Sequence, residues 1–313
     1  MINRRNFMKL ASFGVVGFIT SKHLISESRM PKEFQNLASP DYDKVFHSEI
    51  EWENVSKGLD FSRVRVYRNK KLIDIIAALK IDPIHNNIKV FNGYNYKDNV
   101  EVHNIEGWQK KTGAIAMINS AQYMADPYYK PVALVICDGK QKGPKHNRYS
   151  RGMLVAEPRK DLGNKLKKID LLDFDYDKFD YKTTPYLQGV QHWPILIDRK
   201  GKIKVKKSLW QANRTIVAKD KDDKILFLTT EGGYFTLYNF GRFLKDSNQR
   251  KNKGFNIHTA MNMDGGYEAN MVVKTPKLSY ITYGEFETYG PNNDATIFGL
   301  KIKIPGAIGV FPR

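Results

Sequence analysis

From about residue 60 onward the chain is a series of short apolar runs separated by turn-forming residues. Runs of this length, rich in Val, Ile, Phe and Tyr, are typical of β-strands. The predicted strands lie at residues 62–67, 71–79, 88–91, 114–119, 132–137, 153–156, 194–197, 214–218, 225–230, 260–263 and 271–273. Asp, Gly and other turn formers at 138–139, 198–201 and 219–224 predict hairpin-type connections. The pattern therefore predicts a sheet that is mixed or mostly antiparallel.

Helical periodicity is scarcer and occurs in two short stretches, 104–112 and 237–244. Residues 31–60 read as a polar lead-in with little periodicity. The charged and aromatic stretch 158–182 predicts an exposed excursion. We therefore predict one α+β domain over residues 60–313, with a mixed or mostly antiparallel β-sheet core and a few flanking helices.

Residues 1–30 resemble a twin-arginine export signal. Arg4 and Arg5 precede Lys9 and a short apolar stretch that contains glycine. That stretch is too short to span a membrane as a mature helix, and no clean cleavage site follows it. We expect an exported, periplasmic or extracellular protein, tethered to the inner membrane if the segment stays uncleaved. The alternative is an ordinary N-terminal helix that begins with two arginines.

Composition excludes several classes of protein. The chain has 313 residues, of which 41% are hydrophobic and 12% aromatic, a composition typical of globular proteins. Its single cysteine, Cys137, excludes an intramolecular disulfide framework and a multi-thiolate metal site. No apolar run reaches the roughly 18–20 residues of a spanning helix, which excludes a multi-span membrane protein.

The net charge is strongly positive, at +18. Residues 1–30 hold five basic residues and one acidic residue, which leaves +14 on the rest of the chain. Such a field attracts polyanions, and an exported protein meets anionic or phosphorylated glycans rather than nucleic acid. No basic run reads as a nucleic-acid arm and no groove-binding motif is visible. Genomic composition bias is the alternative explanation of the charge.

The most informative segment for chemistry follows the predicted strand 260–263. There Asp264 precedes Gly265 and Gly266, so a carboxylate stands at a strand end and the glycines let a ligand approach the backbone closely. Glu231 begins a similar acid-Gly-Gly-Tyr string after another predicted strand. The alternative interpretation is two ordinary strand-to-loop turns.

Two further clusters are candidates for binding. Gln191, His192 and Trp193 combine hydrogen-bonding groups with a ring able to stack on a sugar. Arg214, followed by Thr215 at a strand start, could hold a phosphate or carboxylate. A lone Arg or His is more often structural, so both clusters are hypotheses.

Motifs of several catalytic classes are absent from the sequence. It contains no HExxH, no GxSxG, no Walker loop and no GxGxxG after a strand. The seven histidines do not cluster with carboxylates at zinc spacing. Nothing requires a metal or another cofactor, and we predict none. Cys137 lies in an apolar run and is expected to be packed rather than nucleophilic.

Read in order, five sequence elements resemble the phosphodiester glycosidase family, whose domain also occurs in exopolysaccharide-associated bacterial proteins. The elements are INSAQY at 118–123, KPVALVICDG at 130–139, QHWPILI at 191–197, NRT at 213–215 and NMDGG at 262–266. The resemblance covers about residues 110–275. It implies hydrolysis of a sugar joined through its anomeric carbon to a phosphodiester.

The resemblance also suggests roles for the candidate residues. Asp264 would be the general base or nucleophile at the anomeric carbon, and Arg214 would clamp the phosphate. Phosphate is already a good leaving group, so one essential carboxylate with phosphate binders would suffice. The remaining candidates are Asn119, Gln191 and Thr215 as hydrogen-bonding positioners, Gly265 and Gly266 in the substrate loop, Glu231 as a second carboxylate, and His192 or Glu268 as auxiliaries.

The loop after Asp264 departs from the family pattern, because Tyr267 and Glu268 stand where small residues are usual. Two alternatives to an enzyme therefore stay open. One is a non-catalytic protein that binds an anionic polysaccharide on the same fold. The other is an assembly factor for the envelope or for exopolysaccharide, held by an uncleaved N-terminal segment.

Overall fold

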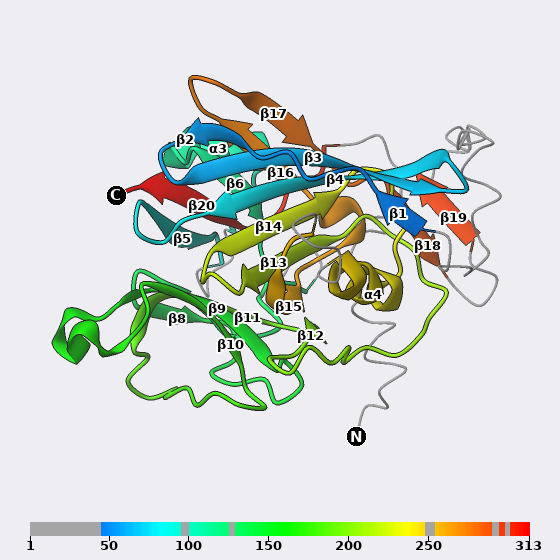
Figure 1. The fold of residues 1–313 in the computed structure, drawn as a ribbon. Helices are drawn as coiled ribbons and strands as arrows, with labels where there is room; N and C mark the ends of the chain where they lie inside the picture. The colour runs from blue at the N-terminus through cyan, green and yellow to red at the C-terminus, as the bar shows by residue number, and fades with distance from the viewer. Residues whose placement is uncertain (1–44, 95–99, 125–128, 248–253, 290–293, 298–300) are drawn as a thin grey trace, which may run out of the picture.

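The computed structural model describes residues 45–94, 100–124, 129–247, 254–289, 294–297 and 301–313. The twin-arginine segment and the first part of the polar lead-in lie outside these residues. Strand pairing is antiparallel throughout the described part of the chain, in three large sheets and one two-stranded ribbon (Figure 1). With two α-helices among the described residues, the protein is richer in β-structure than the α+β class that we expected.

The largest sheet has eight strands. Its path runs β1 (Val45–His47), β3 (Leu59–Arg68), β4 (Lys71–Ile81), β14 (Ile225–Thr230), β13 (Thr215–Asp220), β15 (Ile257–Asn262) and β12 (Ile195–Ile197), with β2 (Glu53–Ser56) paired to β3. Strands β1 and β2 lie in the stretch that we expected to be a polar lead-in. Ile216 of β13 pairs with Asn262 of β15 and with Leu228 of β14. This register brings the start of β13 and the end of β15 to the same edge.

Two five-stranded sheets complete the core. One runs β10 (Ile169–Asp173), β9 (Gly152–Pro158), β11 (Tyr186–His192), β7 (Val135–Cys137) and β8 (Lys140–Lys142). The other runs β17 (Ser279–Thr282), β16 (Met271–Lys274), β6 (Ala116–Asn119), β20 (Gly306–Pro312) and β5 (Asn86–Asn92). The ribbon pairs β18 (Phe286–Tyr289) with β19 (Asp294–Ile297). One apolar cluster takes residues from all three sheets, among them Phe227 of β14, Leu154 of β9 and Ile118 of β6.

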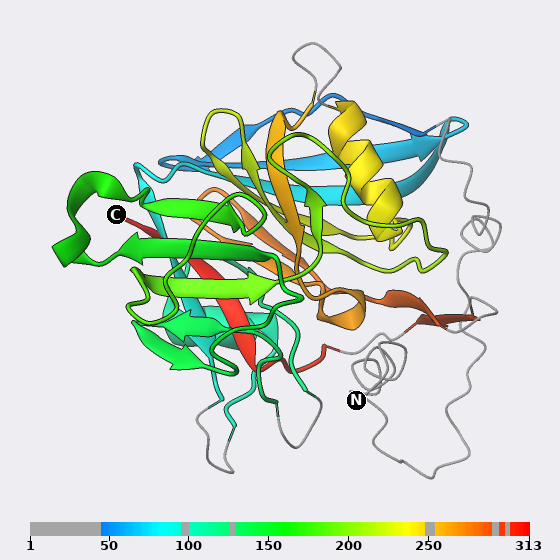
Figure 2. The same cartoon turned by 90° about the horizontal axis from the view of Figure 1, so that it is seen from below.

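The two helices begin and end where local sequence dictates. In α3 (Ile105–Thr112) the Asn104 side chain accepts a hydrogen bond from the Gly107 N–H, and Gly113 closes the helix with a left-handed φ of 71°. In α4 (Leu237–Ser247) Phe240, Phe243 and Leu244 are buried on one face. Figure 2 shows α4 and the β10–β8 sheet on opposite sides of the view. Both predicted helices are confirmed.

All eleven predicted strand regions overlap strands, whereas β8, β11, β17, β18, β19 and β20 were not predicted. Two further stretches differ from expectation. The excursion 158–182 contains β10, whose five residues are all buried. It can be buried because its charge is compensated: the Asp170 carboxylate accepts from the buried Lys219 ammonium. Gln191 and His192, predicted to precede a strand, are themselves the last residues of β11.

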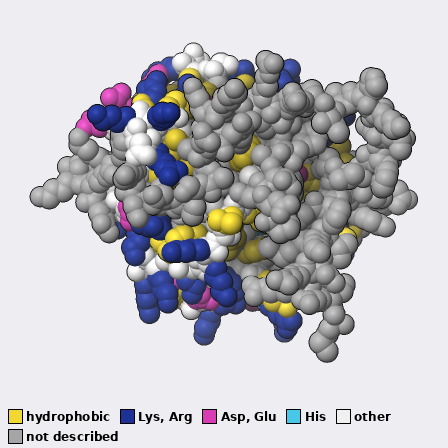
Figure 3. All heavy atoms as spheres, turned by 90° about the vertical axis from the view of Figure 1, so that its right-hand side faces the viewer, with side chains coloured by type: hydrophobic (Ala, Val, Ile, Leu, Met, Phe, Trp, Pro, Cys, Tyr) yellow, Lys and Arg dark blue, Asp and Glu magenta, His cyan; other side chains and the backbone are white. Residues whose placement is uncertain are grey.

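Positive side chains cover much of the visible described surface. Figure 3 shows Lys and Arg side chains gathered along the lower left of one face. No helix in the described part of the chain has the length and apolar character needed to cross a membrane.

Candidate active site

Asp264 lies just past the end of β15, held by two neighbouring segments. The Met263 N–H donates to the Thr215 carbonyl at 2.8 Å, and the Asp264 N–H donates to the Ser120 carbonyl at 3.4 Å. The Asp264 backbone is therefore tied to both β13 and the residue that follows β6.

Asn119, at the end of β6, connects these segments through its side chain. Its Nδ2 donates to the Asp264 carbonyl at 2.9 Å. Its Oδ1 accepts from the Thr215 hydroxyl at 2.8 Å and from the Asn270 N–H at 3.1 Å. Asn119 and Thr215 are both buried, so they position the Asp264 loop through an interior hydrogen-bond network.

The glycines after Asp264 allow two charged side chains to come close to the loop. Gly266 has a φ of +66°, and a Cβ there would lie 2.3 Å from Oε2 of Glu287. A Cβ at Gly265 would lie 3.4 Å from Nη1 of Arg214. The sequence predicted a close approach to the loop backbone, and the structure shows protein side chains making it.

Glu287 is a site residue that the sequence analysis missed. It belongs to β18, which contacts the η3 turn (Gly266–Glu268), and Figure 2 shows the two side by side. Its carboxylate is 9% exposed and accepts from Trp210 Nε1 at 3.1 Å. Glu285 lies two residues before Glu287, immediately ahead of β18, and no motif in the sequence distinguishes these two glutamates.

Three carboxylates influence one another at this site: Asp264, Glu268 and Glu287. Burial, followed by the negative charges of Glu268 and Glu287, raises the pKa of Asp264 well above its usual range. Burial and then Glu287 raise the pKa of Glu268 to about 7. Hydrogen bonds oppose these shifts: the Gly265 N–H donates to the Asp264 carboxylate at 3.1 Å, the Gln122 side chain also bonds to it, and the Tyr123 hydroxyl donates to Glu268 at 3.3 Å.

Arg214 is the buried positive charge of this cluster. Its Nε donates to the Phe235 carbonyl at 3.1 Å and its Nη2 to the Trp210 carbonyl at 2.7 Å. Burial lowers its pKa to about 10, and the charge of Glu287 opposes that shift. Arg214 is therefore charged at neutral pH, and the backbone carbonyls hold its guanidinium in one orientation with Nη1 against Gly265.

Glu231 lies in a different cluster. Arg63 of β3 donates to both of its carboxylate oxygens, at 2.9 and 2.7 Å, and the Tyr280 hydroxyl donates at 2.7 Å. Although Glu231 follows a strand end as Asp264 does, the structure brings it to β3 and β17 rather than to the Asp264 carboxylate.

The side chains of Gln191 and His192 lie beside backbone groups of the protein, within hydrogen-bond distance. Gln191 donates to the carbonyls of Asn147 and Ser150 and accepts from the Leu134 N–H, so its amide binds the β11 region internally. His192 Nδ1 lies 2.7 Å from the Asn262 carbonyl, two residues before Asp264. Burial lowers the pKa of His192 to about 4, so the ring is neutral at neutral pH.

Several buried polar atoms around Asp264 have no hydrogen-bond partner within the described residues. They are Ser120 Oγ, Gln122 Oε1, His192 Nε2, Asn262 Oδ1 and Asn270 Oδ1. Unpaired buried donors and acceptors are costly in a folded protein unless water or a ligand bonds to them.

No group of three His, Cys, Asp or Glu side chains in the described part of the chain is arranged to hold a metal ion. Burial raises the pKa of the Cys137 thiol to about 12, so this cysteine is protonated at neutral pH.

Comparison with known proteins identifies the family and supports the fold. The family model described as phosphodiester glycosidase matches residues 112–311. The structure is similar to the zebrafish N-acetylglucosamine-1-phosphodiester alpha-N-acetylglucosaminidase (NAGPA) catalytic domain auto-inhibited by pro-peptide. The TM-score is 0.53 at 14% identity, covering 86% of this chain and 89% of that one.

It is also similar to a hypothetical protein from Synechocystis, with a TM-score of 0.53 at 11% identity, covering 85% of this chain and 64% of that one. No curated protein matches the sequence. At these identities the solved structures support the fold, whereas the family match spans well over half of the sequence. The chain therefore belongs to the phosphodiester glycosidase family.

Proposed function

We propose that the protein hydrolyses a sugar-1-phosphodiester and releases the free sugar. The observation that carries the proposal is the convergence of Asp264, Glu268 and Glu287 with the buried Arg214 at one strand edge, within the family-matched region. Membership of the family supplies the substrate class, a phosphorylated glycan. Burying like charges together is costly, and active sites are where such clusters concentrate.

The reaction needs a base for the attacking water and a positive group that stabilises the charge of the departing phosphate. In the proposed step the oxygen of water bonds to the anomeric carbon while the bond from that carbon to the phosphate oxygen breaks. The water proton goes to a carboxylate, and the phosphate monoester leaves. We assign Asp264 to the anomeric carbon and Glu268 as its partner.

Burial and the neighbouring negative charges raise the pKa of both Asp264 and Glu268, so the pair retains protons more readily than exposed carboxylates do. One ionised member serves as the base, and the protonated member reduces repulsion of the anionic diester. Arg214 adds a fixed positive charge through Nη1. Since its other two nitrogens are bound to backbone carbonyls, it acts as an oriented charge rather than as a free two-pronged clamp.

The test is sugar release from a panel of sugar-1-phosphodiesters by the full chain. We expect turnover by the wild type, and a loss of about 10²-fold or more in kcat for Asp264→Asn, which keeps shape but removes the carboxylate. Glu101→Gln, an exposed change outside the site, is the matched control and should retain activity. Equal turnover by wild type and Asp264→Asn would refute the assignment. Binding of an anionic glycan without any turnover would support the non-catalytic alternative instead.

We further propose that the protein is exported, on the evidence of Arg4, Arg5 and the apolar stretch that follows. Replacing both arginines by lysine should leave the protein in the cytoplasm. Cell fractionation measures this, and intact-mass analysis of the exported protein shows whether residues 1–30 remain. Unchanged export of the double variant would contradict the proposal.

A further inference from the structure

A pocket of about 690 Å³ lies at the far end of β13 and β15 from Asp264. Asp220, the last residue of β13, and His258, near the start of β15, line it, while the opposite ends of both strands lead to the active site. Because β13 has six residues, the two places are about 15–20 Å apart. The family-derived reaction makes no use of this pocket.

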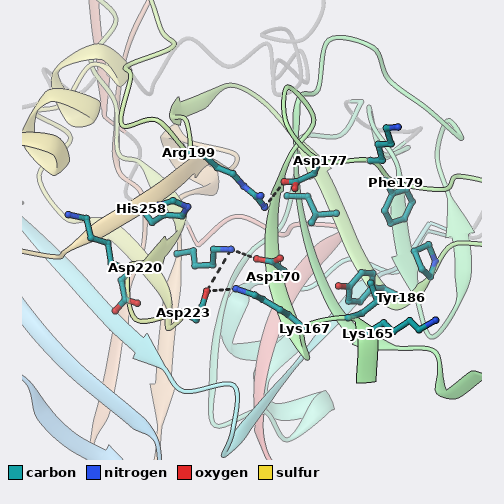
Figure 4. A pocket seen from close by; sticks show the side chains of 16 residues that line it. Lys165, Lys167, Asp170, Asp177, Phe179, Tyr186, Arg199, Asp220, Asp223 and His258 are labelled. Carbon is teal, nitrogen blue, oxygen red and sulfur yellow. Dashed lines mark hydrogen bonds and ion pairs between the residues drawn. The ribbon is translucent and has the colours of Figure 1, made fainter. Parts of the chain in front are cut away.

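Three of the four acidic side chains of the pocket are paired with cations. Figure 4 shows them paired with cations that line the same pocket. The pairs are Lys219 with Asp170, Arg199 with Asp177 at 2.6 Å and Lys167 with Asp223 at 2.5 Å. The remaining acid, Asp220, accepts from two backbone N–H groups of its own turn, at 2.9 and 2.8 Å.

Positive charge and one donor remain beyond these pairs. Lys165, Lys178 and Lys221 also line the pocket, are exposed and form no ion pair within the described residues. Arg199 binds Asp177 through Nη2, but its Nε is buried and has no hydrogen-bond partner there. The pocket therefore presents an excess of positive charge to a bound anion, whereas Arg199 Nε is buried away from it.

The pKa of His258 reflects the same excess of positive charge. Burial, followed by the charges of Lys219 and Arg199, lowers its pKa, whereas Asp223 opposes the shift. The local potential is positive even though four carboxylates line the pocket.

One wall of the pocket is apolar and aromatic. Phe179 and Tyr186 line it, and Tyr186 is 4% exposed and so fixed in place. Figure 4 shows the Tyr186 ring beside Lys165 and the Phe179 ring farther from it on the same side of the pocket. Rings next to cations suit a ligand with an apolar ring face and a negative group.

An acidic sugar suits this lining. Its negative group is attracted by the excess positive charge, and its hydroxyl groups can donate hydrogen bonds to the carboxylates of the pocket.

We propose that this pocket binds an acidic or phosphorylated sugar residue of a glycan chain. The negative group lies against the exposed lysines Lys165, Lys178 and Lys221, and the ring lies against Phe179 and Tyr186. The site would anchor a polymer remote from Asp264, and it does not depend on the proposed catalytic function.

Isothermal titration of the full chain with an oligogalacturonate tests the proposal. Lys165, Lys178 and Lys221 are changed together to Gln; the matched control changes Lys57, Lys71 and Lys140, which are also exposed and lie outside the pocket. We expect the pocket variant to bind about tenfold more weakly and the control less than about threefold. Equal losses in the two variants would show a general surface field and overturn the pocket.

Further probes separate the ligand classes. Phe179→Leu should weaken oligogalacturonate binding and leave the weaker binding of inorganic phosphate unchanged. Tighter binding of a single-stranded oligonucleotide, or equal binding of a neutral maltooligosaccharide, would overturn an acidic sugar as the ligand. Repeating the titration with Asp264→Asn keeps the outcomes distinct: retained binding supports the pocket whatever the activity, and lost binding places the ligand at Asp264.

Discussion

At the scale of single residues, the site brings together charged side chains that would lie apart in water in the unfolded chain. Asp264, Glu268 and Glu287 are brought together by η3 and β18, with Arg214 as the nearby cation. Removing carboxylates from water raises their pKa, and placing them side by side raises it further. The folded protein therefore binds protons at these carboxylates at pH values where the unfolded chain has released them.

This predicts a dependence of stability on pH. Between about pH 5 and pH 8 the folded protein holds protons on Glu268 and Asp264 that the unfolded chain has released, so stability falls as pH rises. Thermal unfolding measures the slope of Tm against pH, which Glu268→Gln should reduce.

Asp74 is the control for this prediction, because burial raises its pKa to about 7 although it lies outside the cluster of Asp264, Glu268 and Glu287. Asp74→Asn should reduce the Tm slope yet leave the pH profile of kcat unchanged, whereas Glu268→Gln should alter both. An unchanged kcat profile in Glu268→Gln would contradict its role.

Arg214 carries the second prediction at this scale. Arg214→Lys keeps the charge but loses the fork that binds the Phe235 and Trp210 carbonyls. We expect kcat/KM to fall by about tenfold or more and the free energy of unfolding by about 1–3 kcal/mol. Arg63→Lys is the control, because it weakens the more exposed ion pair with Glu231. It should lower the free energy of unfolding by about 1 kcal/mol or less. Similar effects in both variants would show that Arg214 has no special role.

At the scale of elements, the site depends on where strands end. β6, β13 and β15 end or begin at one edge, and Asn119 links all three through side-chain and backbone hydrogen bonds. The loop from Asp264 then turns through Gly266 beneath β18. The backbone at a strand end is held in place because neighbouring strands hydrogen-bond to it on both sides.

Gly266→Ala tests this arrangement. A Cβ would lie 2.3 Å from the Glu287 carboxylate at a φ of +66°. We expect a loss of about 2–4 kcal/mol in stability together with most of the activity. Gly201→Ala is the matched control, because Gly201 has a φ of +70° with no atom near its Cβ position. It should cost about 1 kcal/mol and leave activity intact. Comparable effects at the two glycines would mean that backbone strain alone explains Gly266.

At the scale of the whole molecule, the dominant property is the charge of +18. A positive surface speeds the encounter with an anionic substrate, and salt screens it. We expect kcat/KM for a phosphodiester to fall by about tenfold between low salt and about 0.5 M salt. The kcat value should change little, since the reacting groups are buried. Salt-independent kcat/KM would show that the surface charge plays no part in capture.

Much of the fold could be predicted locally. The eleven predicted strand regions and the helices at 104–112 and 237–244 rest on periodicity and caps, which neighbouring residues determine. β10 escaped prediction because Asp170 looks exposed until Lys219, distant in sequence, is placed beside it. Glu287 escaped because 23 positions separate it from Asp264 with no motif between them.

The sequence by itself determined the eleven predicted strand regions, the family, and the position of Asp264 with its two glycines after a strand, since these depend on local pattern and order along the chain. Only the tertiary structure decided which carboxylates share a site. Glu231 and Asp264 follow strands in the same local pattern, yet one pairs with Arg63 and the other is buried beside Glu268 and Glu287. The physical reason is that the energy of a charge depends on which distant partners surround it, and antiparallel pairing of remote strands selects those partners.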